Sequence, residues 1–269
     1  MNLNKKLKIN NILRKSFALP LVISISFAAM GFSSYNNYIN RQFNDYVVFY
    51  PQHQDDEVLW AGSAIVEAIK EKGQDNVFVV QVSNGSGISV FNKYDKYKNL
   101  TRKEKTEYRN REFLASVEKL GVKKENITIL SNINKSDTTD FNLMERTALN
   151  FEKKYKNITH VAHTYKLDDH LQHLKNGAVI QSLYNSGKIK DVKYFIKPGF
   201  ESDIPMGEKI IYKSNSNEDY DKVKNACEQY KIINESENRE GIGYKSDHKS
   251  FDNLVLDKSV PAILHTPNI

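Results

Sequence analysis

Hydrophobic positions along the chain gather in short apolar runs that are separated by longer stretches with helical periodicity. Runs rich in β-branched and aromatic residues predict buried strands. Such runs occur at residues 46–50, 77–82, 127–130, 160–163 and 194–196. Because strands that alternate with helices build a mostly parallel sheet, the pattern predicts an α/β fold with helices on both faces of the sheet.

Cap signals place the helices between these strands. The Thr101-x-x-Glu104 capping box predicts a helix start, and Gly121 predicts the end of the same helix. Asn142 opens a second pattern of this kind with Glu145. The predicted helices therefore cover residues 61–72, 101–121, a stretch beginning at 142, and 174–184.

The chain beyond Pro198 carries weaker signals. Residues 217–234 have a helical pattern, and residues 241–261 are expected to be irregular with short strands. His248 and His265 are expected at the surface. A second short segment, residues 83–89, is rich in Gly and Ser and is interpreted either as a loop at the rim of an active site or as a plain linker.

Two polar motifs stand where predicted strands pass into helices. The first apolar run stops at His53-Gln-Asp55-Asp56-Glu, and a second His pair stands far downstream in Asp168-Asp-His170-Leu-Gln-His173. Alone, the first motif could be a polar turn and the second a solvated pair on a helix. Together they supply two histidines and a carboxylate, which bind zinc-type ions and leave coordination positions open. Open α/β sheets place their ligands at this edge.

Geometry within each motif suggests a division of labour. Successive side chains of an extended segment point to opposite faces, so one of Asp55 and Asp56 should ligate the ion and the other should face the substrate. His170 and His173 are three residues apart and would share one helical face. The positive end of the helix favours a neutral His173. A protonated His170 would need an anionic partner such as Asp168 or Asp169.

These motifs resemble those of the LmbE-like family, also called the PIG-L family, which contains metal-dependent N-acetylglucosaminyl deacetylases. The resemblance covers residues 45–198 and includes the segment from Arg109 to Glu112 as well as the two histidine motifs. This chain departs from the family pattern at two positions. Gln52 separates Pro51 from the first histidine, and Gln172 stands where many members have Asp.

The resemblance implies a role for each matched residue. His53, Asp56 and His173 resemble the metal ligands of the family. Asp55 resembles its general base, and His170 resembles the group that stabilises the oxyanion and helps the amine to leave. Arg109 resembles an arginine that contacts sugar hydroxyls.

The first forty residues predict a separate N-terminal segment. They hold five basic residues and no acidic one, followed by an apolar run at residues 17–32. At ~1.5 Å per residue this run is shorter than the ~30 Å hydrocarbon core, so a cleaved signal peptide is favoured over a permanent anchor. A buried N-terminal helix is the alternative. The expected location is extracytoplasmic, either secreted or anchored to the membrane by this segment alone.

Charge and cysteine content narrow the function further. Removing the five basic residues of the leader from the net charge of +6 leaves +1, so nothing favours nucleic-acid binding. Cys227 is the only cysteine, which excludes an intrachain disulfide. It lies outside both histidine motifs and is interpreted as a structural residue.

The combined expectation is a leader at residues 1–40 followed by one domain at 41–269, a Rossmann-like, mostly parallel sheet with an irregular C-terminal extension. One divalent ion, zinc by preference with ferrous iron left open, would serve the removal of acetyl from an N-acetylated amino sugar of an extracytoplasmic glycan or glycolipid. The alternatives are a non-catalytic surface glycan-binding protein and an amidase acting on a small N-acyl substrate. Barrel-shaped polysaccharide deacetylases are disfavoured, because Glu57 follows the aspartates and the histidine spacing is His-x-x-His.

Overall fold

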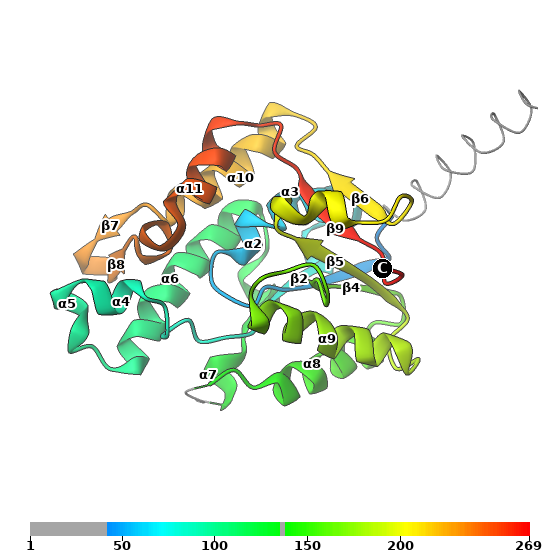
Figure 1. The fold of residues 1–269 in the computed structure, drawn as a ribbon, viewed down its shortest axis with the longest axis horizontal. Helices are drawn as coiled ribbons and strands as arrows, with labels where there is room; N and C mark the ends of the chain where they lie inside the picture. Colours follow the sequence, from blue (N-terminus) through cyan, green and yellow to red (C-terminus); the bar gives the residue numbers. More distant parts are fainter. Residues whose placement is uncertain (1–41, 135–137) are drawn as a thin grey trace, which may run out of the picture. The chain divides into compact units, whose positions relative to one another are not determined.

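The computed structural model describes residues 42–134 and 138–269. The predicted leader at residues 1–40 lies outside this part of the chain. Within the described residues, the strands form a seven-stranded sheet with the order β3-β2-β1-β4-β5-β9-β6 (Figure 1). Its strands are β1 (Tyr46–Tyr50), β2 (Val77–Gln81), β3 (Ile127–Ile129), β4 (Ile158–His163), β5 (Asp191–Ile196), β6 (Lys209–Tyr212) and β9 (Ala262–His265).

The first five strands of this sheet are parallel, as the sequence predicts. β1 pairs with β2 on one side and with β4 on the other, and β2 and β4 continue the parallel pairing to β3 and β5. β9 is antiparallel to both β5 and β6, so the sheet is mixed at this edge. Sequence analysis did not identify β6 or β9, which are only four residues long each.

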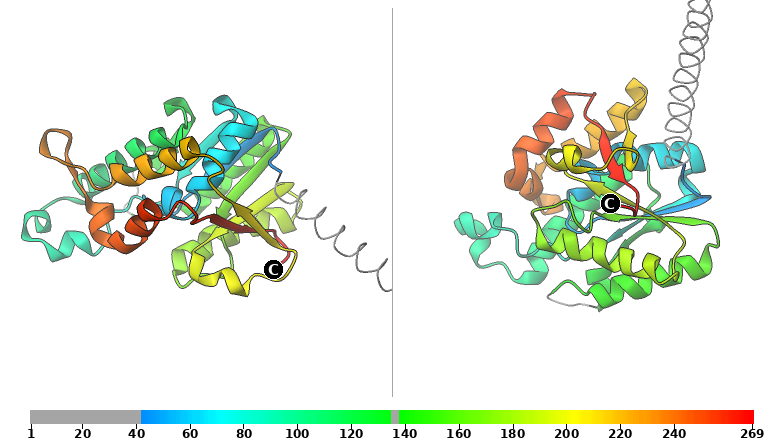
Figure 2. Two further views of the ribbon diagram at one scale, coloured as in Figure 1. Left: turned by 90° about the horizontal axis from the view of Figure 1, so that it is seen from above. Right: turned by 45° about the vertical axis from the view of Figure 1, so that its right-hand side comes forward.

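Helices cover both faces of the sheet. On one face, α8 (Phe141–Lys154) and α9 (Leu171–Asn185) bury an apolar cluster with Val48 and Val80. The alternate side chains Val47 and Phe49 pack on the other face. Figure 2 shows the two helical layers from further directions. The second layer consists of α2 (Asp56–Leu59), α3 (Gly62–Lys72), α6 (Arg102–Leu120), α10 (Asn217–Gln229) and α11 (Ile242–Leu256).

Several local signals act as the sequence predicts. Thr101 and Glu104 form the capping box of α6, and Gly121 ends that helix with a φ of 101°. Cys227 is buried in the second layer, in agreement with a structural role. α8 begins one residue earlier than its predicted cap, because the side chain of Asp140 accepts a hydrogen bond from the Leu143 N–H.

The C-terminal region differs from the expectation. Residues 241–261 are largely helical, and α11 is interrupted only at Asp247, whose φ and ψ are −146° and 55°. This helix lacks a local side-chain cap, so its start could not be recognised from neighbouring residues. His265 is buried on β9 and lies 2.9 Å from Thr164 Oγ1, whereas His248 is exposed as predicted.

Short elements complete the described fold. α4 (Val90–Lys93) and α5 (Asp95–Lys98) follow the Gly-rich loop, α7 (Leu130–Asn134) follows β3, and β7 (Ile233–Asn234) pairs with β8 (Arg239–Glu240). No helix in residues 42–134 or 138–269 is both long and apolar enough to cross a bilayer.

Candidate metal centre

The candidate site lies beyond the carboxyl ends of β1 and β4. These two strands are neighbours in the sheet, and the strand order runs outward from them in opposite directions. Such a switch point leaves a crevice between the connections that depart to either side, which is where open α/β sheets bind ligands. Both histidine motifs of the sequence meet there.

Buried polar contacts hold the loop that follows β1. The Gln52 N–H lies 3.1 Å from His163 Nε2 at the end of β4, and Gln81 Nε2 donates to the Gln52 carbonyl at 2.9 Å. The Ser83 N–H also donates to that carbonyl. The loop therefore keeps ladder-like contacts with β2 after β1 has ended. Gln52, one of the two residues that depart from the family pattern, takes part in each of these contacts.

The start of α9 is fixed against the same strand ends. At Gly177, a Cβ atom would stand 2.3 Å from the His163 carbonyl oxygen, so only glycine allows the helix to come this close. The side-chain oxygen of Asn176 accepts from the His163 N–H, and its nitrogen donates to the Tyr50 carbonyl. This amide joins α9 to β1 and β4 and places His173 one turn earlier above their ends.

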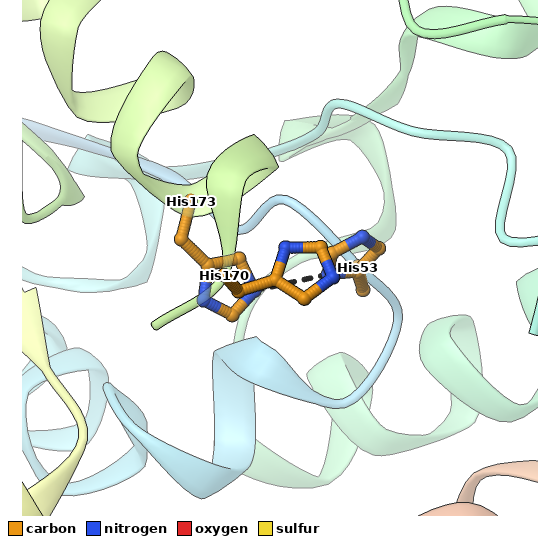
Figure 3. Close-up of side chains that lie close together, drawn as sticks. All are labelled: His53, His170 and His173. Carbon is orange, nitrogen blue, oxygen red and sulfur yellow. Dashed lines mark hydrogen bonds between the residues drawn. The ribbon is translucent and has the colours of Figure 1, made fainter. Parts of the chain in front are cut away.

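The three predicted metal ligands converge. His53 Nδ1 lies 3.0 Å from His173 Nε2, and each of these nitrogens lies 3.4 Å from Asp56 Oδ2. Zinc bonds of about 2.0–2.1 Å in a tetrahedron imply ligand separations of about 3.3 Å. Two imidazoles and a carboxylate at this spacing therefore fit a single divalent ion. Figure 3 shows the imidazoles of His53 and His173 together with that of His170.

His163 is a potential metal ligand that the sequence analysis did not predict. It is buried, and its Nε2 lies 3.1 Å from Asp56 Oδ2. Asp56, His163 and His173 form one group of potential ligands in the described residues, and His53, His170 and His173 form another. The signal that could have identified His163 was its place at the end of a predicted strand, at the sheet edge where the other motifs lie.

Further contacts orient the ligands. Asp168 Oδ2 lies 2.9 Å from His173 Nδ1, and Gln172 Oε1 lies 2.8 Å from His53 Nε2. An acceptor on the outer nitrogen of an imidazole leaves the inner nitrogen free to bind a metal. Trp60 Nε1 donates to Asp56 Oδ1 at 3.1 Å, which turns the other carboxylate oxygen towards the histidines.

The protonation of His173 differs from the expectation. Burial lowers the pKa, but the carboxylates of Asp56 and Asp168 outweigh burial and raise the pKa of His173 to about 9. The helix end therefore does not keep this imidazole neutral in the ion-free protein. Since a ligating histidine must lose its proton, metal binding is expected to weaken in acid.

His170 lies at the rim of the cluster. It is the N-cap of α9, and its ring centre is 4.7 Å from that of His53 and 4.6 Å from that of His173. Burial, followed by the two neighbouring histidines, lowers the pKa of His170. The two carboxylates considered as partners have other contacts, because Asp168 pairs with His173 and Lys197 and Asp169 pairs with Lys197.

Asp55 is paired with Arg109, and His53 is among the charges that influence it. Its Oδ2 accepts a hydrogen bond from Arg109 Nη2 at 2.9 Å. Burial is the largest influence on its carboxyl group and raises the pKa of Asp55 to about 6, although Arg109 acts in the opposite direction. The backbone of Asp55 has a φ of 122°, a conformation that non-glycine residues rarely adopt. The chain thus turns between the two aspartates and directs them to different partners.

Arg109 is buried rather than open to the crevice. Its side chain is 1 % exposed, and it donates to Asp55, Glu112 and the Gln54 carbonyl. Its contact with sugar hydroxyls stays a prediction from the resemblance. The Gly-rich loop packs beside the same region, because a Cβ on Gly85 would stand 2.1 Å from Gln54 Oε1.

Comparison with solved structures places this fold among known ones. A deacetylase from the teicoplanin biosynthetic pathway is similar over 82 % of this chain and 97 % of its own, with 13 % identity and a TM-score of 0.56. N,N′-diacetylchitobiose deacetylase from Pyrococcus horikoshii covers 82 % and 83 %, with 15 % identity and a TM-score of 0.51. A 4-carboxy-2-hydroxymuconate hydratase from Pseudomonas putida covers 82 % and 95 %, with 13 % identity and the same TM-score.

These similarities at low identity establish the fold, and the hydratase among them means that the fold by itself does not fix the reaction. A search of curated proteins finds no match to this chain. The family described as PIG-L, GlcNAc-PI de-N-acetylase, matches residues 47–184, which include both histidine motifs and His163. The chain therefore belongs to the PIG-L family.

Proposed function

We propose that this protein is a metal-dependent hydrolase that removes acetyl from an N-acetylated amino sugar outside the cytoplasmic membrane. The observation that carries the proposal is the convergence of His53, Asp56 and His173 at separations of 3.0–3.4 Å, with Asp55 next to Asp56 in the sequence, in a member of the PIG-L family. A binding protein would need neither an open set of metal donors nor an adjacent carboxylate.

The residues of the site have complementary roles in this reaction. A bound divalent ion supplies Lewis acidity toward the amide carbonyl and toward water. The Asp55 carboxylate takes a proton from the attacking water, and its pKa of about 6 leaves it ionised near neutral pH. His170 hydrogen-bonds the developing oxyanion from the rim and helps the amine to leave, and the proton that Asp55 has taken from water balances the one that the amine gains.

We propose zinc as the ion. Imidazole nitrogens and one carboxylate suit zinc, and they also suit ferrous iron and other first-row divalent ions. Metal analysis of protein purified without chelators decides among them. The proposal of a single ion requires a stoichiometry near one per chain.

The extracytoplasmic substrate is supported by the sequence of residues 1–40, with its basic start and short apolar run. A surface polysaccharide, a peptidoglycan fragment or a glycolipid would be accessible to an exported enzyme. Protease treatment of intact cells, combined with N-terminal sequencing of the mature protein, tests the location. Protein confined to the cytosol would contradict the extracytoplasmic substrate without affecting the deacetylase chemistry.

The reaction is tested by acetate release. The purified full chain, loaded with zinc, is incubated with chitobiose-type oligosaccharides, peptidoglycan fragments and N-acetylglucosaminyl lipids. Release of acetate with appearance of a free amine on one of these substrates is expected, and chelation should abolish it. A metal-loaded protein that binds such glycans without releasing acetate would favour the glycan-binding alternative.

A further inference from the structure

The segment after β5 contributes none of the residues to which the proposed reaction assigns a role. It includes α10 and α11 and lies outside the family match at residues 47–184. Both helices pack against α6 and also against α2, the short helix that begins at Asp56. In Figure 1 they lie over α6 and α2 on one face of the sheet. Hydrogen bonds between these helices connect the C-terminal segment to Asp55.

Arg109 is the centre of these contacts. Its Nη2 donates to Asp55 Oδ2 at 2.9 Å and to the Gln54 carbonyl, and its Nη1 donates to Glu112 Oε2 at 3.4 Å. A buried guanidinium is stable only where it is paired, so these partners account for its position. With 1 % of its side chain exposed, Arg109 offers very little surface to a sugar.

The C-terminal segment holds Glu112 in turn. Its carboxylate accepts hydrogen bonds from the Ile242 N–H at 2.6 Å and from the Gly243 N–H at 2.9 Å. These are the first N–H groups of α11, which have no partner within the helix and favour a negative charge. Gly243 also fits closely, because a Cβ there would stand 2.7 Å from Arg109 Nη1.

A second connection reaches the backbone of Asp55. The Tyr230 hydroxyl donates to Glu57 Oε1 at 2.7 Å, and Glu57 Oε2 accepts from the Asp55 N–H at 2.9 Å. A positive φ at a non-glycine residue is strained and persists only where the surroundings hold it. The C-terminal segment therefore supports both the side chain and the main chain of Asp55.

We propose that the C-terminal segment positions Asp55 for catalysis, α11 through Glu112 and Arg109 and the end of α10 through Tyr230 and Glu57. Arg109 and Glu112 are then positioning residues rather than sugar ligands. The proposal rests on the proposed function in one respect, namely that Asp55 is the base. It assigns a catalytic contribution to the part of the chain beyond the matched residues. It also explains why an arginine on a charged helix is buried.

The first test separates positioning from substrate binding. Glu112→Gln keeps the shape of the side chain and removes its charge. We expect kcat to fall roughly tenfold to a hundredfold, because small displacements of a catalytic group have effects of this size, while KM and metal content stay unchanged. Arg109→Lys, which loses the two-pronged contact but keeps the charge, should show the same split.

Glu240→Gln is the matched control for the first test. Glu240 is also a buried carboxylate of the C-terminal segment, but it contacts Lys96 and Tyr97. Its substitution should leave kcat unchanged. A rise in KM at constant kcat in Glu112→Gln or Arg109→Lys would overturn the proposal and restore the sugar-ligand role.

The second test does not depend on turnover, so a failure of the proposed function remains distinguishable. Crystal structures of Gly243→Ala and of Gly62→Ala are compared. A Cβ on Gly62 meets Val223 of α10 at an ordinary 3.4 Å, whereas one on Gly243 would stand 2.4 Å from Tyr230 Cδ1 and 2.7 Å from Arg109 Nη1, so that one or both of these supports of Asp55 must move. Asp55 should move away from its position only in Gly243→Ala. If Asp55 keeps its place there, the proposal is wrong even when no acetate is released.

Discussion

Two adjacent aspartates of this protein face opposite environments. Asp56 faces the histidines contributed by β4 and α9. Burial acts to raise the pKa of Asp56, but the two histidines outweigh burial and hold this pKa well below the usual range. Asp55 faces Arg109 and the helices of the other layer, and burial raises its pKa to about 6. Identical side chains thus differ in pKa because the backbone turns between them, as the proposed roles of metal ligand and base require.

The largest effect should come from removing the histidine shared by both groups of donors. His173→Ala is expected to lose the ion and all measurable acetate release, since two potential ligand sets include this residue. Metal content per chain and activity are measured. His248→Ala, which changes an exposed histidine of α11, is the control and should retain both. Stoichiometric metal in His173→Ala would refute the assignment.

The two Asn substitutions test the comparison directly. Asp56→Asn removes a charged ligand and should lower metal affinity, whereas Asp55→Asn should keep the metal and lose turnover by about a hundredfold or more, the usual contribution of a positioned base. Metal content and kcat are measured for both variants under the same loading conditions. If Asp55→Asn loses the ion while Asp56→Asn retains it, the two roles are reversed.

A smaller effect is expected at Gln172, which accepts from the outer nitrogen of His53. Gln172→Leu should weaken metal binding by about 10–100-fold, because the orientation and proton position of His53 would no longer be fixed. Chelator competition, followed by the fluorescence of the single tryptophan Trp60, gives the affinity. Gln172→Glu keeps an acceptor and should bind at least as tightly as the natural protein. Equal affinities for all three would show that the contact has no influence.

The last effect concerns the stability of the folded protein rather than its activity, on the Asp55 side. Burial raises the pKa of Glu57 to about 8 from a usual value of 4.5, so between these values the folded protein holds a proton that the unfolded chain has released. The contribution of the protonated Glu57 to the stability of the fold is complete below about pH 4.5 and is lost as pH rises through 8. The contribution of Glu57 to the free energy of unfolding should therefore fall between pH 5 and pH 8.5.

Glu57→Gln cannot release this proton, so the free energy of unfolding of the variant should fall less over this range, by a few kcal/mol at about 1.4 kcal/mol per pH unit. Urea unfolding at the two pH values measures the difference. Glu240→Gln serves as the comparison, because the pKa of Glu240 is lowered rather than raised. The same pH dependence in Glu57→Gln and in the natural protein would contradict a neutral, buried Glu57.

Much of the fold was predictable because its signals are local. Apolar runs of β-branched and aromatic residues coincide with β1 to β5, and the box formed by Thr101 and Glu104 begins α6 as expected. The start of α11 was not predictable, since its N–H groups are satisfied by Glu112, about 130 residues earlier in the chain. A cap supplied by a distant residue leaves no trace in the neighbouring sequence.

The candidate site divides in the same way. The sequence by itself supplied the donor types, two histidines and a carboxylate at strand ends, because metal chemistry restricts which residues can serve. The resemblance to the family then predicted that these are His53, Asp56 and His173. Only the tertiary structure decided that His163 joins them and that Arg109 turns inward to Asp55. Those two side chains are buried by elements distant in sequence, and pairing across such separations depends on how the layers pack rather than on any local pattern.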